Sequence, residues 1–144
     1  MRRTARALTT VAVLALPLAN VAARAAAATV TAVKKRTVWK TVAGPQAQAD
    51  RWGYVEVTLV VRTTTTTTGS KKKVTRRITG VPVPVYPDHT GRSVFISQNA
   101  IPILISEVLQ SQMKPNIDMV SGATFTSQAF VQSLQAALLK AKKV

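Results

Sequence analysis

The sequence predicts an α+β domain, built from a small antiparallel β-sheet and two packed helices. Alternating apolar residues dominate the first part of the chain, which is typical of strands that bury one face. Apolar residues spaced three and four apart follow in the last third, which is typical of amphipathic helices. Strands that come before helices favour an antiparallel sheet, because parallel strands need a long crossover between them. A chain of 144 residues has the length of one domain.

Two segments in the first half of the chain are expected to be strands. Residues 37–43 alternate between apolar and polar and end at Gly44-Pro45, a pair that breaks strands. Residues 54–62 alternate more clearly, so one face should be buried in the core and the other should be exposed to solvent or covered by another element. The apolar face of this second segment consists of Val55, Val57, Leu59 and Val61. The residues before the first strand show no strong period, and we expect 28–36 to form a loose leader.

A low-complexity stretch follows, with six threonines at 63–68, then Gly69-Ser70 and three lysines at 71–73. Threonine favours extended backbone and Gly-Ser supplies a turn, which predicts a protruding hairpin whose second arm covers 74–79. The adjacent lysines repel one another unless they are solvated or paired with anions. The hairpin therefore either contacts an anionic surface, such as lipid headgroups or wall phosphates, or is a solvated loop.

Residues 81–92 are expected to connect this hairpin to the first helix. Pro82 and Pro84 cannot donate backbone hydrogen bonds, so the valines around them form an edge strand or an extended connector. Residues 86–92 have the composition of a surface turn. His89 in this turn has no cysteine or carboxylate cluster beside it, which indicates a loop residue rather than a metal ligand.

The first helix is expected from Ser97 or Asn99 to about Gln110. Apolar residues repeat at three and four over this stretch, and Pro102 is tolerated if it falls in the first turn. Lys114-Pro115 ends the helix.

The second helix is expected from Ser127 to about Lys142. Phe130 and Leu134 begin its apolar face, and lysines near its end suit the negative end of the helix dipole. Residues 116–120 are expected to form a short buried strand that leads into the loop before this helix.

The loop before the second helix has the composition of an anion-binding site. Its small residues let a ligand approach the backbone, and Gly122 can take a positive φ. Where such a loop opens a helix, unpaired N–H groups and the positive end of the dipole favour a phosphate. A Ser/Thr-rich turn can also be a plain N-cap, and the residues alone leave this alternative open. The residues concerned are Asp118, Ser121, Gly122, Ala123, Thr124, Phe125, Thr126 and Ser127.

The pattern Asp118-x-x-Ser121-Gly122-Ala123-Thr124-x-Thr126-Ser127 resembles the flavin-attachment motif of the FMN-binding domain family. That family includes flavin subunits of the sodium-pumping NADH:quinone reductase and of the Rnf complex, together with many short exported proteins. The likeness covers roughly residues 43–141. The sequence departs from the family at Ser97, where many members carry Asn, and in the Thr-rich insertion.

The resemblance implies an α+β fold, bound FMN and a role in electron transfer. In covalent members the FMN phosphate is esterified to the Thr that ends Ser-Gly-Ala-Thr, which is Thr124 here. The phosphate would then lie at residues 122–126, and the isoalloxazine would rest on an apolar surface to which Phe125 can contribute. Whether Trp39, Trp52 or Tyr54 contacts the ring is open, because an aromatic residue in a small domain is usually core.

The N-terminus has the layout of a secretory signal peptide. Three arginines among the first six residues precede an apolar run at 7–23, and four alanines follow at 25–28. Cleavage near Ala27 divides the chain into a signal peptide at 1–27, a leader at 28–36 and an FMN-binding domain at 37–144. The alternative is a single membrane anchor, although polar residues and a proline interrupt the run. Loss of residues 1–27 removes four arginines and no acid, so the net charge falls from +15 to +11.

Composition excludes several classes of function. The chain has no cysteine, so disulfides, thiolate metal sites and a lipoprotein anchor are excluded. Its five acids are scattered and its one histidine has no orienting partner nearby in sequence, so no triad, carboxylate pair or metal set is expected. Redox chemistry therefore needs a bound cofactor. Export argues against a nucleic-acid partner despite the basic charge.

Two functions remain after these exclusions. The first is an exported FMN-binding protein in electron transfer, served by a flavin transferase and by a redox partner in the membrane or outside the cytoplasm. The second is a basic cell-surface binding or structural domain without a cofactor. The flavin-attachment resemblance favours the first.

Overall fold

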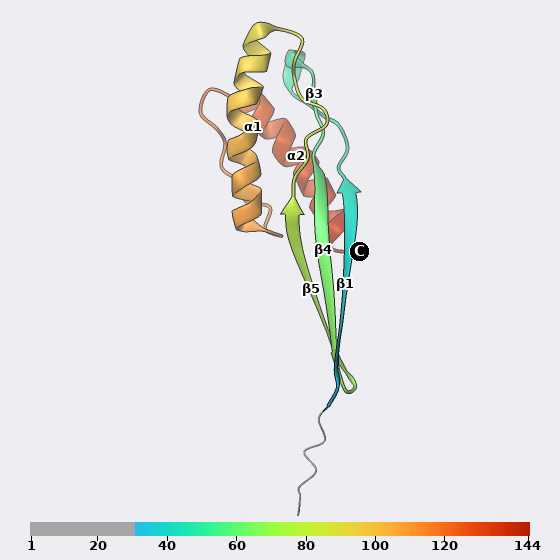
Figure 1. Ribbon diagram of the computed structural model, residues 1–144. Coiled ribbons are helices and arrows are strands. Elements are labelled where there is room, and N and C mark those ends of the chain that lie inside the picture. The colour runs from blue at the N-terminus through green and yellow to red at the C-terminus, as the bar shows by residue number, and fades with distance from the viewer. Residues whose placement is uncertain (1–30) are drawn as a thin grey trace, which may run out of the picture. The chain divides into compact units, whose positions relative to one another are not determined.

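The computed structural model describes residues 31–144, so the predicted signal peptide and its cleavage site lie outside the described residues. Figure 1 shows the described part as a set of strands with two helices packed against it. The prediction of an α+β fold is confirmed. In chain order the elements are β1 (Val33–Ala43), β2 (Ala47–Gln48), the short 3-10 helix η1 (Asp50–Trp52), β3 (Tyr54–Val55), β4 (Thr58–Thr68), β5 (Lys71–Gly80), α1 (Gly91–Ser111) and α2 (Thr124–Ala141).

The main sheet has three antiparallel strands in the order β1-β4-β5. β4 is the central strand, and it pairs with β1 from Val33↔Thr68 to Ala43↔Thr58. β4 and β5 form a hairpin closed by Gly69-Ser70, in which Gly69 has a φ of 60°. A glycine with positive φ at the first position of a two-residue loop matches the twist of the two strands. The predicted Thr-rich hairpin is therefore confirmed.

Two strand boundaries differ from those expected. β1 begins at Val33, so Val33–Arg36 are part of the sheet and not of a loose leader. These residues lack an apolar period because they gain no core contacts. They are held by backbone pairing with the last threonines of β4. The predicted strand at 54–62 is divided into β3 and β4, and Glu56 instead forms a bridge to Val85.

The helix boundaries also differ from those expected. α1 begins at Gly91, within the predicted turn, because Thr90 and Ser93 form a capping box: the Thr90 hydroxyl accepts from the Ser93 N–H at 3.1 Å. Pro102 consequently lies in the interior of α1 and not in its first turn. The buried strand expected at 116–120 is wrong, since this segment has no regular structure and is mostly exposed.

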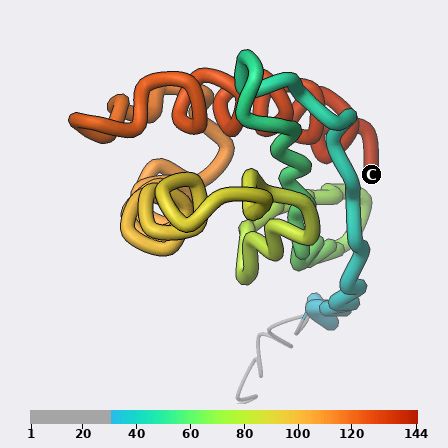
Figure 2. The backbone as a smooth tube through the Cα atoms, turned by 90° about the horizontal axis from the view of Figure 1, so that it is seen from above, coloured from blue at the N-terminus to red at the C-terminus, as the bar shows by residue number. Residues whose placement is uncertain are grey.

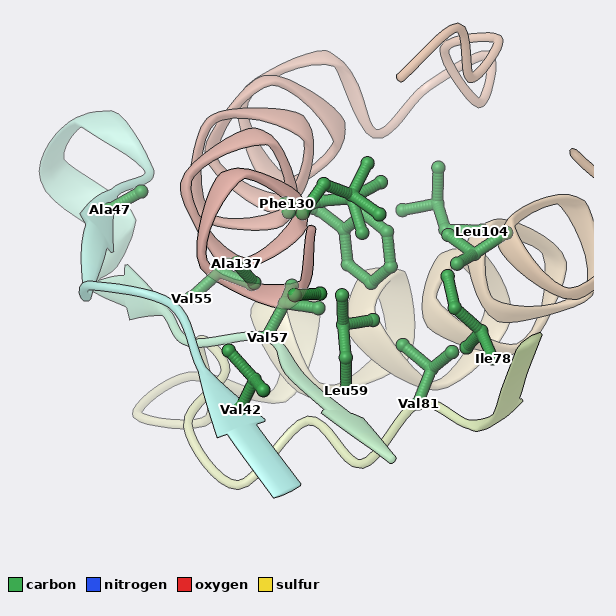
Figure 3. Packing of buried hydrophobic residues seen from close by; sticks show 14 of the residues in the cluster. Val42, Ala47, Val55, Val57, Leu59, Ile78, Val81, Leu104, Phe130 and Ala137 are labelled. Carbon is green, nitrogen blue, oxygen red and sulfur yellow. The ribbon is translucent and has the colours of Figure 1, made fainter. Parts of the chain in front are cut away.

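The core lies between one face of the main sheet and the two helices, as Figure 3 shows for Leu59, Ile78, Leu104 and Phe130. We call this face of the sheet the inner face, and the opposite one the outer face. The buried face predicted for the second strand is confirmed, because all four of its valine and leucine side chains are fully buried. Full burial of each such side chain stabilises the fold by about 1.5–3 kcal/mol.

The two helices contact different strands. α1 packs on β5, whereas α2 packs on β1, β2, β3 and β4. Seen from above in Figure 2, α1 is viewed close to end-on and α2 lies lengthwise across the view. Within residues 31–144, neither helix is long and apolar enough to span a lipid bilayer.

Candidate functional site

The loop from Val120 to Ala123, which we call the motif loop, is closed by two hydrogen bonds. The Ala123 N–H donates to the Val120 carbonyl at 3.0 Å, and the Val120 N–H donates to the Ser127 hydroxyl at 3.1 Å. Gly122 has a φ of 80°, which favours glycine. A Cβ at Gly122 would meet no atom within 4 Å, so this side of the loop is open to a ligand.

The N-terminus of α2 has no side-chain cap. Ala123 is the N-cap residue, and no side chain accepts a hydrogen bond from the first turn. The Ser127 N–H donates to the Ala123 carbonyl at 2.8 Å, so the helix provides no acceptor for the N–H groups of Thr124, Phe125 and Thr126. The alternative of a plain N-cap is therefore wrong for this helix. Its first turn also has no acidic side chain to oppose an anion.

A small hollow lies beside this helix end. It has a volume of about 50 Å³ and is lined by residues from four places in the chain. We call it the Thr124 hollow. Its lining residues are Trp52 from η1, Pro87 from the connector, Ser93 and Ile96 from α1, and Gly122, Ala123, Thr124, Phe125 and Thr126.

A second hollow of about 170 Å³ adjoins the first and shares Ile96, Gly122 and Ala123 with it. We call it the Asn99 hollow. Its other lining residues are Phe95, Asn99, Ala100, Val120 and Ser121. The motif loop thus separates two hollows, and α1 forms the opposite wall of both.

Aromatic side chains stand at the rim of the two hollows. Phe125 is 49% exposed and Phe95 is 69% exposed. Trp52 lines the Thr124 hollow, and the guanidinium of Arg51 lies 5.1 Å from the centre of its ring. Trp39 and Tyr54 line neither hollow; Trp39 instead stacks with Arg62 on the outer face of the sheet. Of the three aromatics left open by the sequence, only Trp52 lies at the site.

The structure brings together most of the predicted site residues but gives them different roles. Thr124 is exposed at the hollow, Thr126 is buried in its wall, and Ser127 is fully buried with its hydroxyl accepting from Val120. Asp118 lines neither hollow; its N–H donates to the Glu107 carboxylate at 2.9 Å. Among residues 31–144 no group of His, Cys, Asp or Glu could hold a metal ion, and His89 is exposed in its loop.

Several lining residues were not predicted from the sequence. Ser93 and Ile96 fell between the expected turn and the expected helix, because α1 was expected to start later. The Thr90-x-x-Ser93 spacing of a capping box could have placed the helix start correctly. Pro87 carried no sequence signal, and Trp52 could not be told from Trp39 and Tyr54, since both residues reach the hollow only through the tertiary fold.

A third hollow lies away from the motif loop, between the proline-containing connector and α1. It has a volume of about 370 Å³ and is lined mainly by apolar residues such as Val81, Ile101 and Ile105. The hydroxyl of Ser97 in its wall is already used, because it donates to the Pro87 carbonyl at 3.0 Å. No helix N-terminus lines this hollow, so it lacks the free backbone N–H groups that would bind a phosphate.

The motif loop fits the phosphate of a flavin nucleotide. The unpaired N–H groups supply donors, Gly122 leaves the approach open, and the Thr124 hollow has room for several water-sized groups. The two hollows are too small to enclose a whole flavin, since sites that do so measure about 300–1,000 Å³.

Comparison with known families gives one match over this region. A family model described as an FMN-binding domain matches residues 50–139, which is more than half of the chain. The matched residues include η1, β4, α1, the motif loop and most of α2. A search of curated proteins gave no significant match.

Proposed function

Because the chain belongs to the FMN-binding domain family, we propose that it acts as an exported electron-transfer protein with FMN held at the N-terminus of α2. The observation that carries this proposal is the uncapped first turn of α2 behind the Ser-Gly-Ala-Thr loop. Phosphate carries two negative charges near neutral pH, and a helix N-terminus with free N–H groups stabilises such charge.

The residues of the motif loop would have different roles in binding the phosphate. The N–H groups of Thr124, Phe125 and Thr126 donate to its oxygens, and Gly122 lets those oxygens approach the backbone. Ser127 and Val120 hold the loop in shape through their hydrogen bond. Ser121 and Asn99, which line the Asn99 hollow, supply polar groups beside the ring.

Thr124 is the hydroxyl best placed for an ester to the flavin phosphate. It is exposed at the hollow, whereas Ser127 is fully buried and its oxygen accepts from Val120. Thr126 is buried to 5% exposure in the wall, so a flavin transferase could reach it less easily. In the ester, Thr124 Oγ1 loses its proton and bonds to phosphorus, and the transferase supplies an activated flavin nucleotide whose activating group leaves.

Electron transfer would depend on the flavin and not on protein side chains. The flavin supplies one-electron and two-electron chemistry when bound, and the protein tunes and positions it. A ring resting on Phe95 and Phe125 would be open to a partner protein, because both side chains are exposed. The motif loop and hollows contain no nucleophile and base pair that would indicate a separate catalytic reaction.

The proposed function also includes export of the chain and two partners outside the cytoplasm. The arginine-rich start, the apolar run and the alanines at 25–28 support secretion and cleavage near Ala27. An exported chain would receive its flavin from a transferase outside the cytoplasm, and would exchange electrons with a redox partner in or near the membrane.

We expect Thr124→Ala to abolish the flavin that survives denaturation, because the ester needs this oxygen. Thr124→Ser should retain part of it, since serine keeps the hydroxyl with a freer rotamer. The measurement is flavin fluorescence on a denaturing gel, using protein made together with a flavin transferase. Mass spectrometry of the peptide that contains Thr124 then locates the adduct. Folding should change little, because Thr124 makes no capping hydrogen bond.

Thr126→Ala serves as the control for position. It should weaken flavin binding, because Thr126 lines the hollow, but leave the covalent adduct in place. An adduct on Thr126 or Ser127 would refute the assignment to Thr124. Yellow native protein without an adduct would show that the domain binds FMN without a covalent bond. Protein that stays colourless with added FMN would instead favour the basic surface domain without a cofactor.

A further inference from the structure

The far end of the main sheet is unusually basic and lies beyond the helices. We call it the basic tip and define it as Val33–Arg36, Thr65–Thr68 and Lys71–Val74, which are paired in register. In Figure 1 the lower ends of β1, β4 and β5 extend past both helices. The basic tip contains no core residue, and it has no acidic residue. Its cationic side chains are all exposed: Lys34, Lys35, Arg36, Lys71, Lys72 and Lys73.

The register places these cations in rows across a central strand of threonines. Lys34, Thr67 and Lys72 form one row, because Lys34 and Lys72 both pair with Thr67. Lys35, Thr66 and Lys73 form the next row, on the opposite face of the sheet. In each row the cations on the outer strands are about 10 Å apart at Cα, with a hydroxyl between them.

The cations are divided evenly between the two faces. Side chains alternate along a strand, so Lys34, Arg36 and Lys72 lie on the inner face. Lys35, Lys71 and Lys73 lie on the outer face by the same rule. Within residues 31–144 all six of these side chains are exposed, so their charges are available to a ligand.

We propose that the basic tip binds a flexible, linear chain of phosphodiesters that lacks bases, such as a poly(glycerol phosphate) chain. Same-face cations recur about every 6.8 Å along a strand, which lets successive phosphates of an extended chain meet successive charges. The threonine hydroxyl in the middle of each row can donate to phosphate oxygens. Neutralised by such a chain, the cations on β1 and β5 would no longer repel one another across the central strand β4.

Two other kinds of anionic partner fit less well. A flat bilayer could meet only one face, and three of the six cations would remain unpaired. The hairpin end, Thr68 to Lys71, also has no apolar side chain to enter a bilayer. Single-stranded nucleic acid is bound by combining cations with aromatic side chains on which bases stack, and the basic tip contains no aromatic residue.

This binding would attach the domain to an anionic polymer while the flavin site stays free. The motif loop lines a hollow together with residues of η1 and α1. No residue of the basic tip belongs to the hydrophobic core. Tethering does not depend on the proposed flavin chemistry, so the two can be tested separately.

The test measures the affinity of the full chain for fluorescently labelled poly(glycerol phosphate) by anisotropy at several salt concentrations. With six contacts, the slope of log K against log salt should be about −4, since each contact to a flexible strand contributes about −0.7. Replacing Lys71, Lys72 and Lys73 together by Ser should bring the slope to about −2 and weaken binding at low salt at least tenfold. The matching triple variant of Lys34, Lys35 and Arg36 should have the same effect.

The control removes three exposed lysines elsewhere, Lys114, Lys142 and Lys143, and has the same net charge as the test variants. It should keep the slope and the affinity, which distinguishes a site from overall charge. Flavin content and the thermal midpoint should be unchanged in the tip variants. Equal weakening by the control, tighter binding to anionic vesicles, or tighter binding to a single-stranded oligonucleotide of equal phosphate number would each overturn the proposal.

Discussion

Thr124 and Ser127 are hydroxyl residues in the first turn of the same helix, yet their surroundings give them different tasks. Ser127 is fully buried and its oxygen accepts from the Val120 N–H, which holds the loop closed. Thr124 is exposed and lines the Thr124 hollow, where a ligand can reach its hydroxyl. The sequence motif predicted both as site residues. The resemblance singled out Thr124 as the attachment residue, but the sequence could not predict that Ser127 closes the loop, because its partner Val120 is brought to it only by the fold of the loop.

Thr63 carries the one buried side-chain polar atom without a hydrogen-bond partner among the described residues. A buried hydroxyl without a partner costs free energy that an apolar group of the same shape avoids. We therefore expect Thr63→Val to raise the free energy of unfolding by about 1 kcal/mol, which urea denaturation would measure.

Thr64→Val is the matched control, since Thr64 is the next residue on the same strand and points to the opposite face. Its effect should remain within about 0.5 kcal/mol, as for other partly exposed positions. A loss of stability in Thr63→Val would mean that the hydroxyl has a partner after all.

At the scale of elements, α2 is joined to the sheet where β3 and β4 separate. The Val57 N–H, which lies between the two strands, donates to the Ser133 hydroxyl at 2.9 Å in the buried core. Gly44 passes so close to α2 that a Cβ there would lie 2.4 Å from the Ser133 carbonyl oxygen. Ser133 thus replaces a strand partner that the interrupted sheet cannot provide.

We expect Ser133→Ala to destabilise the domain by about 1–3 kcal/mol, because the Val57 N–H would remain buried without an acceptor. Thermal unfolding should show a midpoint several degrees lower. Ser106→Ala is the control: its hydroxyl donates to the Ile103 carbonyl of its own helix, and this hydrogen bond is exposed. If both variants had the same midpoint as the parent chain, Ser133 would not support the sheet.

The elements that depend on local pattern were predicted well, and those that depend on distant partners were not. The apolar faces of β4 and α2 follow from their periods, and the hairpin follows from Gly69-Ser70. Val33–Arg36 became a strand only because β4 provides a long partner. Residues 116–120 have strand-like composition, but they pair with no strand of either described sheet and are irregular.

At the scale of the whole described chain, two surfaces with different properties are built on one sheet. The motif loop belongs to the end that carries the helices and the core, where Phe130 and Leu134 fix the start of α2. The basic tip belongs to the end that is stabilised by backbone pairing alone. Ligand binding at one surface should therefore leave the other unchanged.

Hydrogen exchange of backbone amides tests this independence. Without flavin, the amides of Thr124, Phe125 and Thr126 lack helix acceptors and should exchange quickly. Addition of FMN should slow these amides and leave those of the basic tip unchanged, because the tip shares no core contact with the loop. Poly(glycerol phosphate) should slow the amides of β1 and β5 within the tip and leave the loop unchanged. Slower exchange in the tip on addition of FMN alone would show that the two surfaces are coupled through the central strand β4.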